Sequence, residues 1–165
     1  MSSGLVYLRP QPIAYVRAHA DIGQASPIAW SNLQAWCERM PNRADLQVSY
    51  GLTRASEMPN GKIQCTYEAA FEIPFPGDRT GENGLGVKQL PGGAYMRRRH
   101  FGTLSEIDAA LFSFKNEDLA SSQFQLDENR PAIEIIFCNP CKIMDGEMKA
   151  DLLLPIAISS NANAA

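Results

Sequence analysis

Apolar and polar positions predict strands and helices in one order that occurs twice along the chain. In the first half, the run 5–20 predicts two strands interrupted by prolines, because proline cannot donate to a strand ladder. A helix is predicted next, with Ser26 as its N-cap and Pro27 in its first turn. Two more strands are predicted over 46–52 and 62–73. The apolar face of the helix consists of Ala29, Leu33, Trp36, Cys37 and Met40.

The second half follows the same order after residues 75–84, which are rich in proline, glycine and charge and are typical of a linker. A strand pair is predicted over 85–100 and a helix over 103–115. Strands over 132–138 and 151–157 complete the half. The apolar face of the second helix consists of Leu104, Ile107, Leu111 and Phe114.

Residue identities repeat together with this order. The pair GL at 4–5 recurs at 84–85, and the motif AYxR at 14–17 recurs at 94–97. Both matches have the same offset of 80 residues. An internal duplication of strand-helix-strand-strand units therefore explains the pattern better than two unrelated halves.

The duplication predicts an α+β fold with a single domain over 1–165. The repeats, residues 4–74 and 85–157, are expected to form one mostly antiparallel sheet of the SHS2-like type, with both helices on one face. A cleft between the helices is then the expected ligand site. The small polar tail, 158–165, is expected to be disordered.

Composition limits the partners of the chain. It has 165 residues, 45% of them hydrophobic, and a net charge of -3, whereas a protein that binds DNA directly usually has a basic excess. No apolar run approaches the roughly 20 residues that cross a bilayer, and the N-terminus lacks a secretory pattern. We therefore expect a cytoplasmic protein with no membrane partner. In that compartment cysteines are expected to be thiols; they are Cys37, Cys65, Cys138 and Cys141.

A glutamate interrupts the apolar run RPAIEIIFCNP at 130–140. Strand alternation places Glu134 and Ile136 on one face and Ile133 and Ile135 on the other. Both faces are apolar, so Glu134 is partly desolvated on either one, and desolvation raises the pKa of a carboxyl unless hydrogen bonds or a cation compensate. A bound organic cation would supply the missing charge. A buried Tyr or Arg that holds Glu134, or a place at a sheet edge, is the alternative.

Aromatic residues are the next candidates for a site. Most buried rings simply belong to a core, but a cation over a ring gains roughly 0.5–2 kcal/mol. Trp30 and Trp36 lie six residues apart on the first predicted helix, so they point to different sides of it. The remaining candidates, Tyr50, Tyr67 and Tyr95, lie on predicted strands.

Other motifs carry less chemistry. The basic run RRRH at 97–100 predicts a solvated face with salt bridges rather than an anion site. The CNPC motif at 138–141 leaves a strand for a turn, which favours neither a redox pair nor a metal site. The sequence contains no GxSxG, HExxH or P-loop motif. No cofactor and no metal are expected.

An ordered set of segments resembles a known family, the GyrI-like group. This group includes DNA gyrase inhibitor-like proteins and the effector-binding domains of AraC-type and MerR-type multidrug regulators. The most specific segment is the Pro-Gly-Gly-x-Tyr…His-x-Gly motif over 91–102. The matching segments are IAYVR (13–17), AWSNLQAW (29–36), SYG (49–51), LPGGAYMRRRHFG (90–102), IEIIFCNP (133–140) and DLLLPI (151–156).

The resemblance implies a ligand and several of its contacts. Family members typically bind lipophilic, often cationic, small molecules between the two repeats. Glu134 matches the family's glutamate in the pocket floor, and Trp36 and Tyr95 match its pocket aromatics. The chain departs from the family at Ile136, where a tyrosine is frequent, and at Leu111 or Phe112, where a tryptophan is common. At 64–66 it reads Gln-Cys-Thr in place of the family's frequent Arg-x-Asp.

We therefore hypothesise a module that binds hydrophobic organic cations. Glu134 supplies the charge, Trp36 and Tyr95 with Tyr50 or Tyr67 supply rings, and Ile136 and Phe112 complete the walls. No helix-turn-helix segment precedes the domain, so a separate DNA-binding or regulator chain is a candidate partner. The alternatives are a hydrolase of cyclopropane-containing genotoxins with Glu134 as base, and a protein-interaction module such as a gyrase inhibitor.

Overall fold

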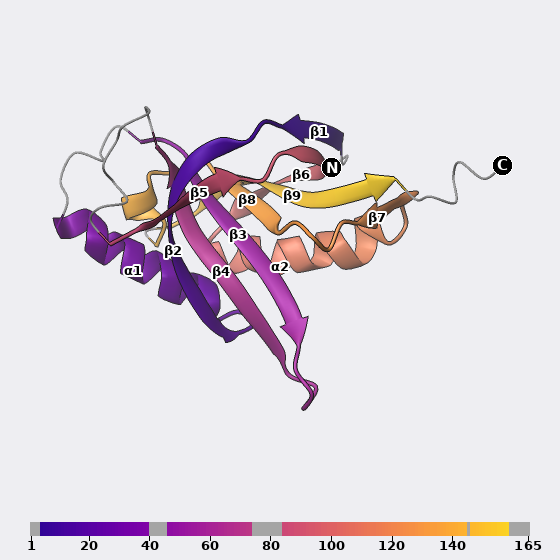
Figure 1. Ribbon diagram of the computed structural model, residues 1–165, viewed down its shortest axis with the longest axis horizontal. Coiled ribbons are helices and arrows are strands. Elements are labelled where there is room, and N and C mark those ends of the chain that lie inside the picture. Colours follow the sequence, from indigo (N-terminus) through magenta and orange to yellow (C-terminus); the bar gives the residue numbers. More distant parts are fainter. Residues whose placement is uncertain (1–3, 40–45, 74–83, 145, 159–165) are drawn as a thin grey trace.

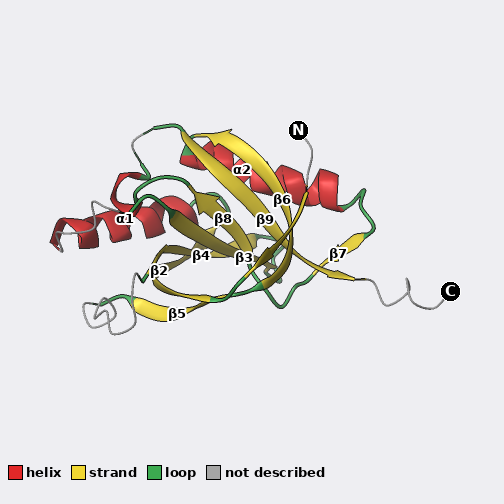
Figure 2. Ribbon diagram, turned by 90° about the horizontal axis from the view of Figure 1, so that it is seen from above, coloured by secondary structure: helices red, strands yellow, loops and turns green. Residues whose placement is uncertain are grey.

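The computed structural model describes residues 4–39, 46–73, 84–144 and 146–158 (Figure 1). In these residues nine strands form a curved, antiparallel sheet. Figure 2 shows both helices on the same side of this sheet, as Figure 1 does from a second direction. The predicted fold class, an α+β fold with a mostly antiparallel sheet and two helices on one face, is therefore confirmed.

The elements follow each other in the predicted order, with one strand that the sequence pattern did not indicate, β7. The strands are β1 (Gly4–Leu8), β2 (Gln11–Asp21), β3 (Ser49–Glu57), β4 (Ile63–Glu72), β5 (Gly86–Leu90), β6 (Gly93–Gly102), β7 (Phe124–Leu126), β8 (Ala132–Ile136) and β9 (Met148–Ile158). The α-helices are α1 (Ala25–Arg39) and α2 (Leu104–Phe114). A π-helical turn, η2 (Lys115–Leu119), extends α2, and a 3₁₀ turn, η3 (Pro140–Lys142), follows β8.

The strand order is symmetric about the central pair of β3 and β8. The order is β1-β6-β9-β8-β3-β4-β2-β5, and β7 adds to β9. Leu52 and Ile133 are partners at the centre of the β3–β8 ladder. The offset of 80 residues also appears in the strand pairing. Tyr15 on β2 pairs with a residue of β4, and Tyr95, 80 positions later on β6, pairs with a residue of β9, the last strand of the second half. The bounds of the two repeats, 4–74 and 85–157, stay a prediction.

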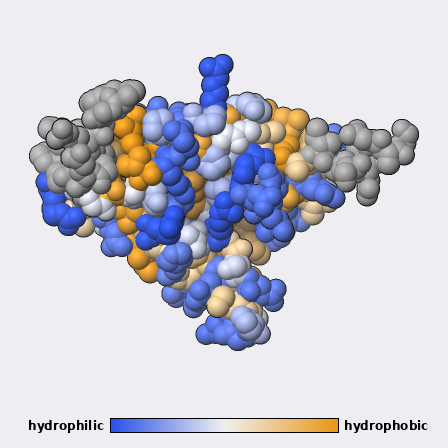
Figure 3. Space-filling view, in the orientation of Figure 1, coloured by the Kyte–Doolittle hydropathy of each residue, from blue (hydrophilic) through white to orange (hydrophobic). Residues whose placement is uncertain are grey.

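Alternation along the strands gives the sheet a core on each face. On the helix face, α1 and α2 bury large side chains such as Trp30, Leu33 and Phe114 against β4, β6 and β9. The opposite face encloses a smaller core inside the curl of the sheet, around Leu52, Tyr95 and related residues. The tip of the β3–β4 hairpin, lowest in Figure 3, projects from this body and is mostly hydrophilic.

The two helices begin differently. Thr103 caps α2 in a capping box with Glu106, as a side-chain oxygen does for free N–H groups at a helix start. The prediction that Ser26 caps α1 is wrong, because α1 begins at Ala25 and Ser26 lies inside its first turn. The hydroxyl of Ser26 instead donates to Asp108 on α2 and so links the two helices.

Two predictions concern segments beside or beyond the ends of elements. The predicted linker lies outside the described residues, except for Gly84, which forms a turn before β5. The predicted disordered tail lies outside them as well, except for Ile158, which is the last residue of β9 rather than part of a tail.

The cysteines correct a further expectation. Cys37 on α1 and Cys141 in η3 form a disulfide, with their Cα atoms 5.9 Å apart, within the usual range for such a bond. The prediction that all four cysteines are thiols is therefore wrong. Its physical reason is that η3 packs against α1, and this contact joins residues 104 positions apart in the sequence. None of the described helices is long and apolar enough to cross a membrane.

Candidate functional site

An open cavity of about 630 Å³ lies on the helix face, between α2 and strands β3, β4 and β8. The beginning of α1 closes one end of it, with Ile22 and Ser26, and the loop before β8 closes the other, with Glu128 and Arg130. Its apolar walls come from both helical and strand elements. They consist of Ile22, Ile63, Leu111, Phe112, Leu126 and Leu154.

Glu134 lies in the middle of β8, at the floor of this cavity, and is fully buried. Its Oε1 atom accepts a hydrogen bond of 2.6 Å from the hydroxyl of Tyr67. That hydroxyl accepts in turn from Nε1 of Trp30 at 2.9 Å. The chain Trp30–Tyr67–Glu134 therefore fixes the orientation of the carboxyl group. No Lys or Arg of the described residues forms an ion pair with it.

A glycine makes this arrangement possible. Gly51 on β3 is the partner of Glu134 in the ladder. A Cβ atom at position 51 would lie 2.6 Å from Oε1 of Glu134 and would also overlap the hydroxyl of Tyr67. The small residue of the SYG segment therefore leaves the space in which Tyr67 reaches across β3 to Glu134.

A second carboxyl group meets Glu134 from the opposite side of the cavity. Asp108 on α2 accepts a hydrogen bond from Ser26, and its carboxyl group is close enough to that of Glu134 for the two to share a proton. Two carboxyl groups can share a hydrogen bond only when one of them carries a proton. Without that proton, Oε2 of Glu134 is a buried oxygen with no donor among the described residues.

The surroundings favour the protonated form of this pair. Burial, followed by the negative charge of Asp108, raises the pKa of Glu134 well above its ordinary range. Burial also raises the pKa of Asp108, against the hydrogen bonds from Glu134 and Ser26, which lower it. The pKa of Tyr67 is raised by burial and by the charge of Glu134. The floor thus carries less negative charge than two free carboxylates would.

The mouth of the cavity differs from the floor. Arg54, Lys115 and Glu128 line it and are exposed to solvent. Arg54 donates to the backbone carbonyls of Glu128 and Asn129, which fastens the loop before β8 to β3. Charges in this position are screened by water and salt far more than the buried carboxyl groups.

Three of the seven residues expected at a site line the cavity: Glu134, Tyr67 and Phe112. The structure places the other four elsewhere. Trp36 lies on the buried side of α1 and packs against Phe71, with 5.7 Å between the ring centroids. Ile136 is buried farther along β8 in the core of the helix face.

The two remaining rings, Tyr50 and Tyr95, belong to the core on the opposite face of the sheet. Tyr50 accepts a hydrogen bond from Gln11 there. Strand alternation explains this placement, because Tyr50 precedes Gly51 and so faces away from the cavity. A strand tyrosine could contact a cation from either face of the sheet, and the sequence does not indicate which face the helices cover.

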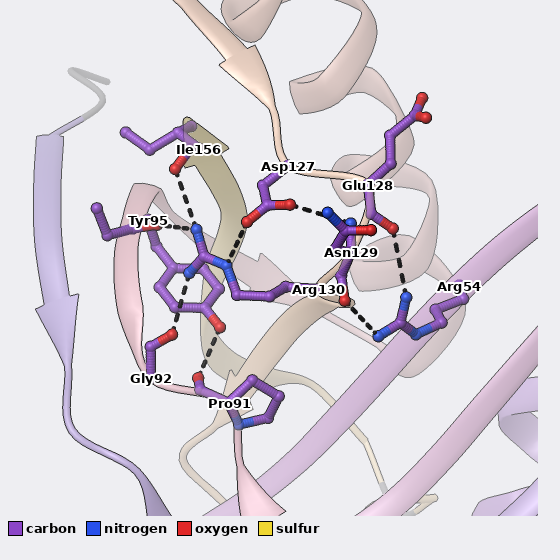
Figure 4. Close-up of polar contacts among 10 residues, drawn as sticks. Arg54, Pro91, Gly92, Tyr95, Asp127, Glu128, Asn129, Arg130 and Ile156 are labelled. Atoms are coloured by element: carbon purple, nitrogen blue, oxygen red, sulfur yellow. Dashed lines mark hydrogen bonds and ion pairs between the residues drawn. The ribbon is translucent and has the colours of Figure 1, made fainter. Parts of the chain in front are cut away.

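Tyr95 belongs to a cluster around Arg130, shown in Figure 4. The guanidinium lies 4.8 Å from the centroid of the Tyr95 ring and forms an ion pair of 2.8 Å with Asp127. It also donates to the carbonyls of Gly92, Ala94 and Ile156. We call Tyr95, Asp127, Arg130 and these three carbonyls the Arg130 cluster. Four of the five N–H groups of Arg130 donate within it.

Sequence reasoning missed Asp108, Ser26 and Gly51, and it rated Trp30 below Trp36. Asp108 did give a signal, because it lies four residues after Leu104 and three before Leu111, on the side of the helix predicted to be buried. A carboxyl at such a position is as unusual as Glu134 in its strand. Trp30 points away from Trp36, as expected, and that direction leads to Tyr67.

The remaining motifs behave as structural features. Arg97 and Arg99 form ion pairs with Asp151, and Arg98 does so with Asp118, which matches the predicted salt-bridged face. Cys141 of the CNPC motif is half of the disulfide. Among the described residues no group of three or more His, Cys, Asp or Glu could hold a metal ion.

Comparison with known families and structures gives consistent results. The sequence model of the GyrI-like small molecule binding domain matches residues 1–157. SAV2435, solved bound to tetraphenylphosphonium, has a similar fold with a TM-score of 0.57 at 14% identity, over 95% of this chain and 94% of that chain. An integron cassette protein from the mobile metagenome of Vibrio cholerae gives a TM-score of 0.61 at 8% identity, over 94% and 95%.

A third structure belongs to a larger assembly. EcmrR, solved in a complex with DNA, gives a TM-score of 0.54 at 14% identity, over 96% of this chain but only 58% of EcmrR. At such identities these structures show a shared fold and leave the ligand open. No curated protein matches the chain.

Proposed function

The chain belongs to the family of GyrI-like small molecule binding domains, and we propose that its cavity binds lipophilic organic cations with Glu134 as the counter-charge. One observation carries this proposal. Glu134 is fully buried at the floor of an open cavity, with one oxygen that has no donor and no basic partner among the described residues. A buried carboxylate in that state is costly, and a cation in the cavity would remove the cost.

The walls favour a bulky apolar ligand. A cavity of about 630 Å³ falls in the range of ordinary small-molecule sites, about 300–1,000 Å³. Phe112 and Leu111 offer apolar contact on the α2 side, and the ring of Tyr67 lies beside Glu134. A cation over such a ring gains roughly 0.5–2 kcal/mol. The ligand of SAV2435, tetraphenylphosphonium, has this combination of apolar bulk and positive charge, which supports the same class here.

The basic residues at the mouth do not exclude a cation. Arg130 is paired with Asp127, and Arg54 donates to the backbone carbonyls of Glu128 and Asn129. Lys115 is exposed, so its repulsion of a ligand at the floor is screened. We therefore expect binding to depend on the buried charge and the apolar contact.

Isothermal titration calorimetry with tetraphenylphosphonium tests the proposal. Glu134→Gln is expected to lower the affinity at least about tenfold, because it keeps the shape and removes the charge. Glu68→Gln is the matched control, since Glu68 is also buried in the sheet but is neutralised by Arg17 and Lys88. Equal affinity in the Glu134→Gln variant and the native protein would show that Glu134 is not the counter-charge.

A second candidate function is favoured by the contact between Tyr67 and Glu134. A hydrolase needs a base and a proton donor close together, and Tyr67 donates to Glu134 at 2.6 Å. In such a reaction Glu134 would take a proton from water, and the Tyr67 hydroxyl would protonate the atom released by ring opening. Incubation with a cyclopropane-containing compound and mass spectrometry of the products would detect a hydrated product. If the compound binds and no hydrated product forms, the hydrolase function is excluded for that compound and only the binding function remains.

A further inference from the structure

Two acidic side chains, not one, meet at the floor of the cavity. Glu134 comes from β8 and Asp108 from α2, and the carboxyl groups are close enough for the charge of Asp108 to raise the pKa of Glu134. Both residues line the cavity. A ligand that reaches Glu134 therefore also meets Asp108.

The oxygens of this carboxyl pair have too few donors. Tyr67 supplies one O–H to Glu134, and Ser26 supplies one to Asp108. An ionised pair offers four acceptor oxygens, and Oε2 of Glu134 has no donor among the described residues. A shared proton satisfies the pair in the absence of ligand. If that proton leaves, new N–H or O–H donors must take its place.

We propose that the carboxyl pair, Asp108 and Glu134, selects cations that carry N–H donors, such as amidinium groups or primary and secondary ammonium groups on an apolar body. This inference rests on the proposed function and names the ligand class within it. A cation of this kind donates one N–H to Glu134 and another to Asp108, and the shared proton is released to solvent. Both carboxylates are then ionised and hydrogen-bonded.

An aprotic cation has a different effect on the pair. A quaternary ammonium or phosphonium ion brings positive charge but no donor. The shared proton must then stay, because two ionised carboxylates in contact would repel each other and leave Oε2 of Glu134 without a donor. Such a ligand meets a pair with a single negative charge. Charge-assisted hydrogen bonds are about twice as strong as neutral ones, so protic cations should bind more tightly.

A purely structural role for Asp108 is the competing explanation. Through Ser26 it connects α1 to α2, and both residues also line a smaller cavity of about 260 Å³ between the starts of the two helices. In that case the substitution Asp108→Asn would change stability but not the preference between protic and aprotic ligands. The two roles therefore differ in selectivity.

Two flat aromatic probes of similar size separate these roles. Protonated proflavine carries N–H donors, and N-methylacridinium carries none. In the native protein, fluorescence titration at pH 7 is expected to show proflavine binding at least about tenfold more tightly. Asp108→Asn is expected to reduce this preference to less than about threefold, while N-methylacridinium keeps its affinity.

Proton release gives a second readout that needs no variant. Calorimetry in buffers of different ionisation enthalpy should show close to one proton released when proflavine binds and none when N-methylacridinium binds. The other titratable groups near Glu134 are Tyr67 and Cys65 on β4, and both remain protonated at neutral pH because burial raises the pKa of each.

The outcomes distinguish the two proposals. Equal affinity of the two probes in the native protein, an undiminished preference in Asp108→Asn, or equal proton release would overturn the role of the carboxyl pair and leave cation binding in place. A failure of both probes and of tetraphenylphosphonium to bind would overturn the proposed function itself.

Discussion

Two clusters of charged and aromatic side chains lie on this sheet, and they differ in how many of their hydrogen-bonding groups find a partner in the fold. In the Arg130 cluster, a carboxylate and three carbonyls accept hydrogen bonds from four of the five N–H groups of the guanidinium, which also lies over a tyrosine ring. At the floor of the cavity, Tyr67 and Asp108 surround Glu134 and leave one buried oxygen without a donor. Both clusters contain a strand tyrosine and a charge, so composition alone does not separate them.

This contrast separates a charge that serves the fold from a charge that a ligand can use. A charge whose hydrogen bonds are nearly all made within the protein stabilises the fold and gains little from a further partner. A buried charge with an open acceptor, next to a cavity, gains from one. The Arg130 cluster is therefore assigned to stability and the Glu134 floor to binding, and substitutions should separate the two.

The largest expected effect is on stability, in Arg130→Ala. This change removes the Arg130 donor from the carbonyls of Gly92, Ala94 and Ile156 and from Oδ2 of Asp127. We expect the free energy of unfolding to fall by about 3 kcal/mol, measured by denaturant titration. The affinity for tetraphenylphosphonium should not fall, since the change removes a positive charge near the mouth. A loss of affinity without a loss of stability would reverse the assignment of the two clusters.

Each cluster also has a glycine packed against it, which gives a matched pair. A Cβ atom at Gly51 would lie 2.6 Å from Oε1 of Glu134, and one at Gly93 would lie 2.6 Å from Nη1 of Arg130. Gly93 also has a backbone φ of 116°, a value that residues other than glycine rarely adopt. Each Gly→Ala change is expected to cost about 2 kcal/mol of unfolding free energy.

Only one of these two glycine substitutions should affect the ligand. Gly51→Ala is expected to weaken the binding of tetraphenylphosphonium, and Gly93→Ala is not. Gly4→Ala is the control for both, because nothing lies within 4 Å of a Cβ atom at that position. Equal effects of Gly51→Ala and Gly93→Ala on the affinity would contradict the division between the clusters.

Sequence reasoning identified Glu134 but not the rest of the floor. Glu134 was visible because a carboxylate in an apolar run is anomalous by itself. The role of Asp108 depends on how α2 packs over β8, and the role of Gly51 depends on a ladder register. Neither property is local. The fold class was predictable because its signals, helical and strand periods and an offset of 80 residues, are local or repeated.

Tyr95 shows a different limit of sequence reasoning. It matched a pocket aromatic by its motif, but strand alternation gives two faces and does not say which one lies under the helices. The structure puts Tyr95 against Arg130 on the face without helices. In the same way, the pairing of Cys37 with Cys141 follows from the packing of η3 on α1, which their spacing does not reveal.

A smaller effect on stability, with a pH dependence, is expected from Glu134→Gln. The glutamine can accept from Tyr67 and donate to Asp108, which completes the hydrogen bonds of the floor. We therefore expect the variant to be more stable than the native protein by about 1 kcal/mol at pH 8. Increased stability together with lost affinity is the signature of a residue kept for a ligand.

The sign of the pH dependence follows from the raised pKa of Glu134, caused by burial and by Asp108. Above the ordinary glutamate pKa of about 4.3, the folded protein binds more protons than the unfolded chain. Its free energy of unfolding therefore decreases as the pH rises from that value through the raised pKa. Denaturant titrations between pH 4 and pH 9 should show this decrease in the native protein and a weaker one in Glu134→Gln. A stability that rises over this range in the native protein would contradict the assignment.

The smallest expected effects compare the two tyrosine hydroxyls. Tyr95→Phe removes the hydrogen bond of 2.7 Å to the carbonyl of Pro91, and Tyr67→Phe removes the one of 2.6 Å to Glu134. Each loss should lower the unfolding free energy by about 1 kcal/mol or less. Only Tyr67→Phe should alter binding, because without the O–H of Tyr67 the ionised form of Glu134 is less favourable and cation binding should shift to higher pH. Calorimetric titrations of both variants with tetraphenylphosphonium at pH 6 and pH 8 measure this shift, and identical pH profiles would place Tyr67, like Tyr95, among the residues that serve the fold alone.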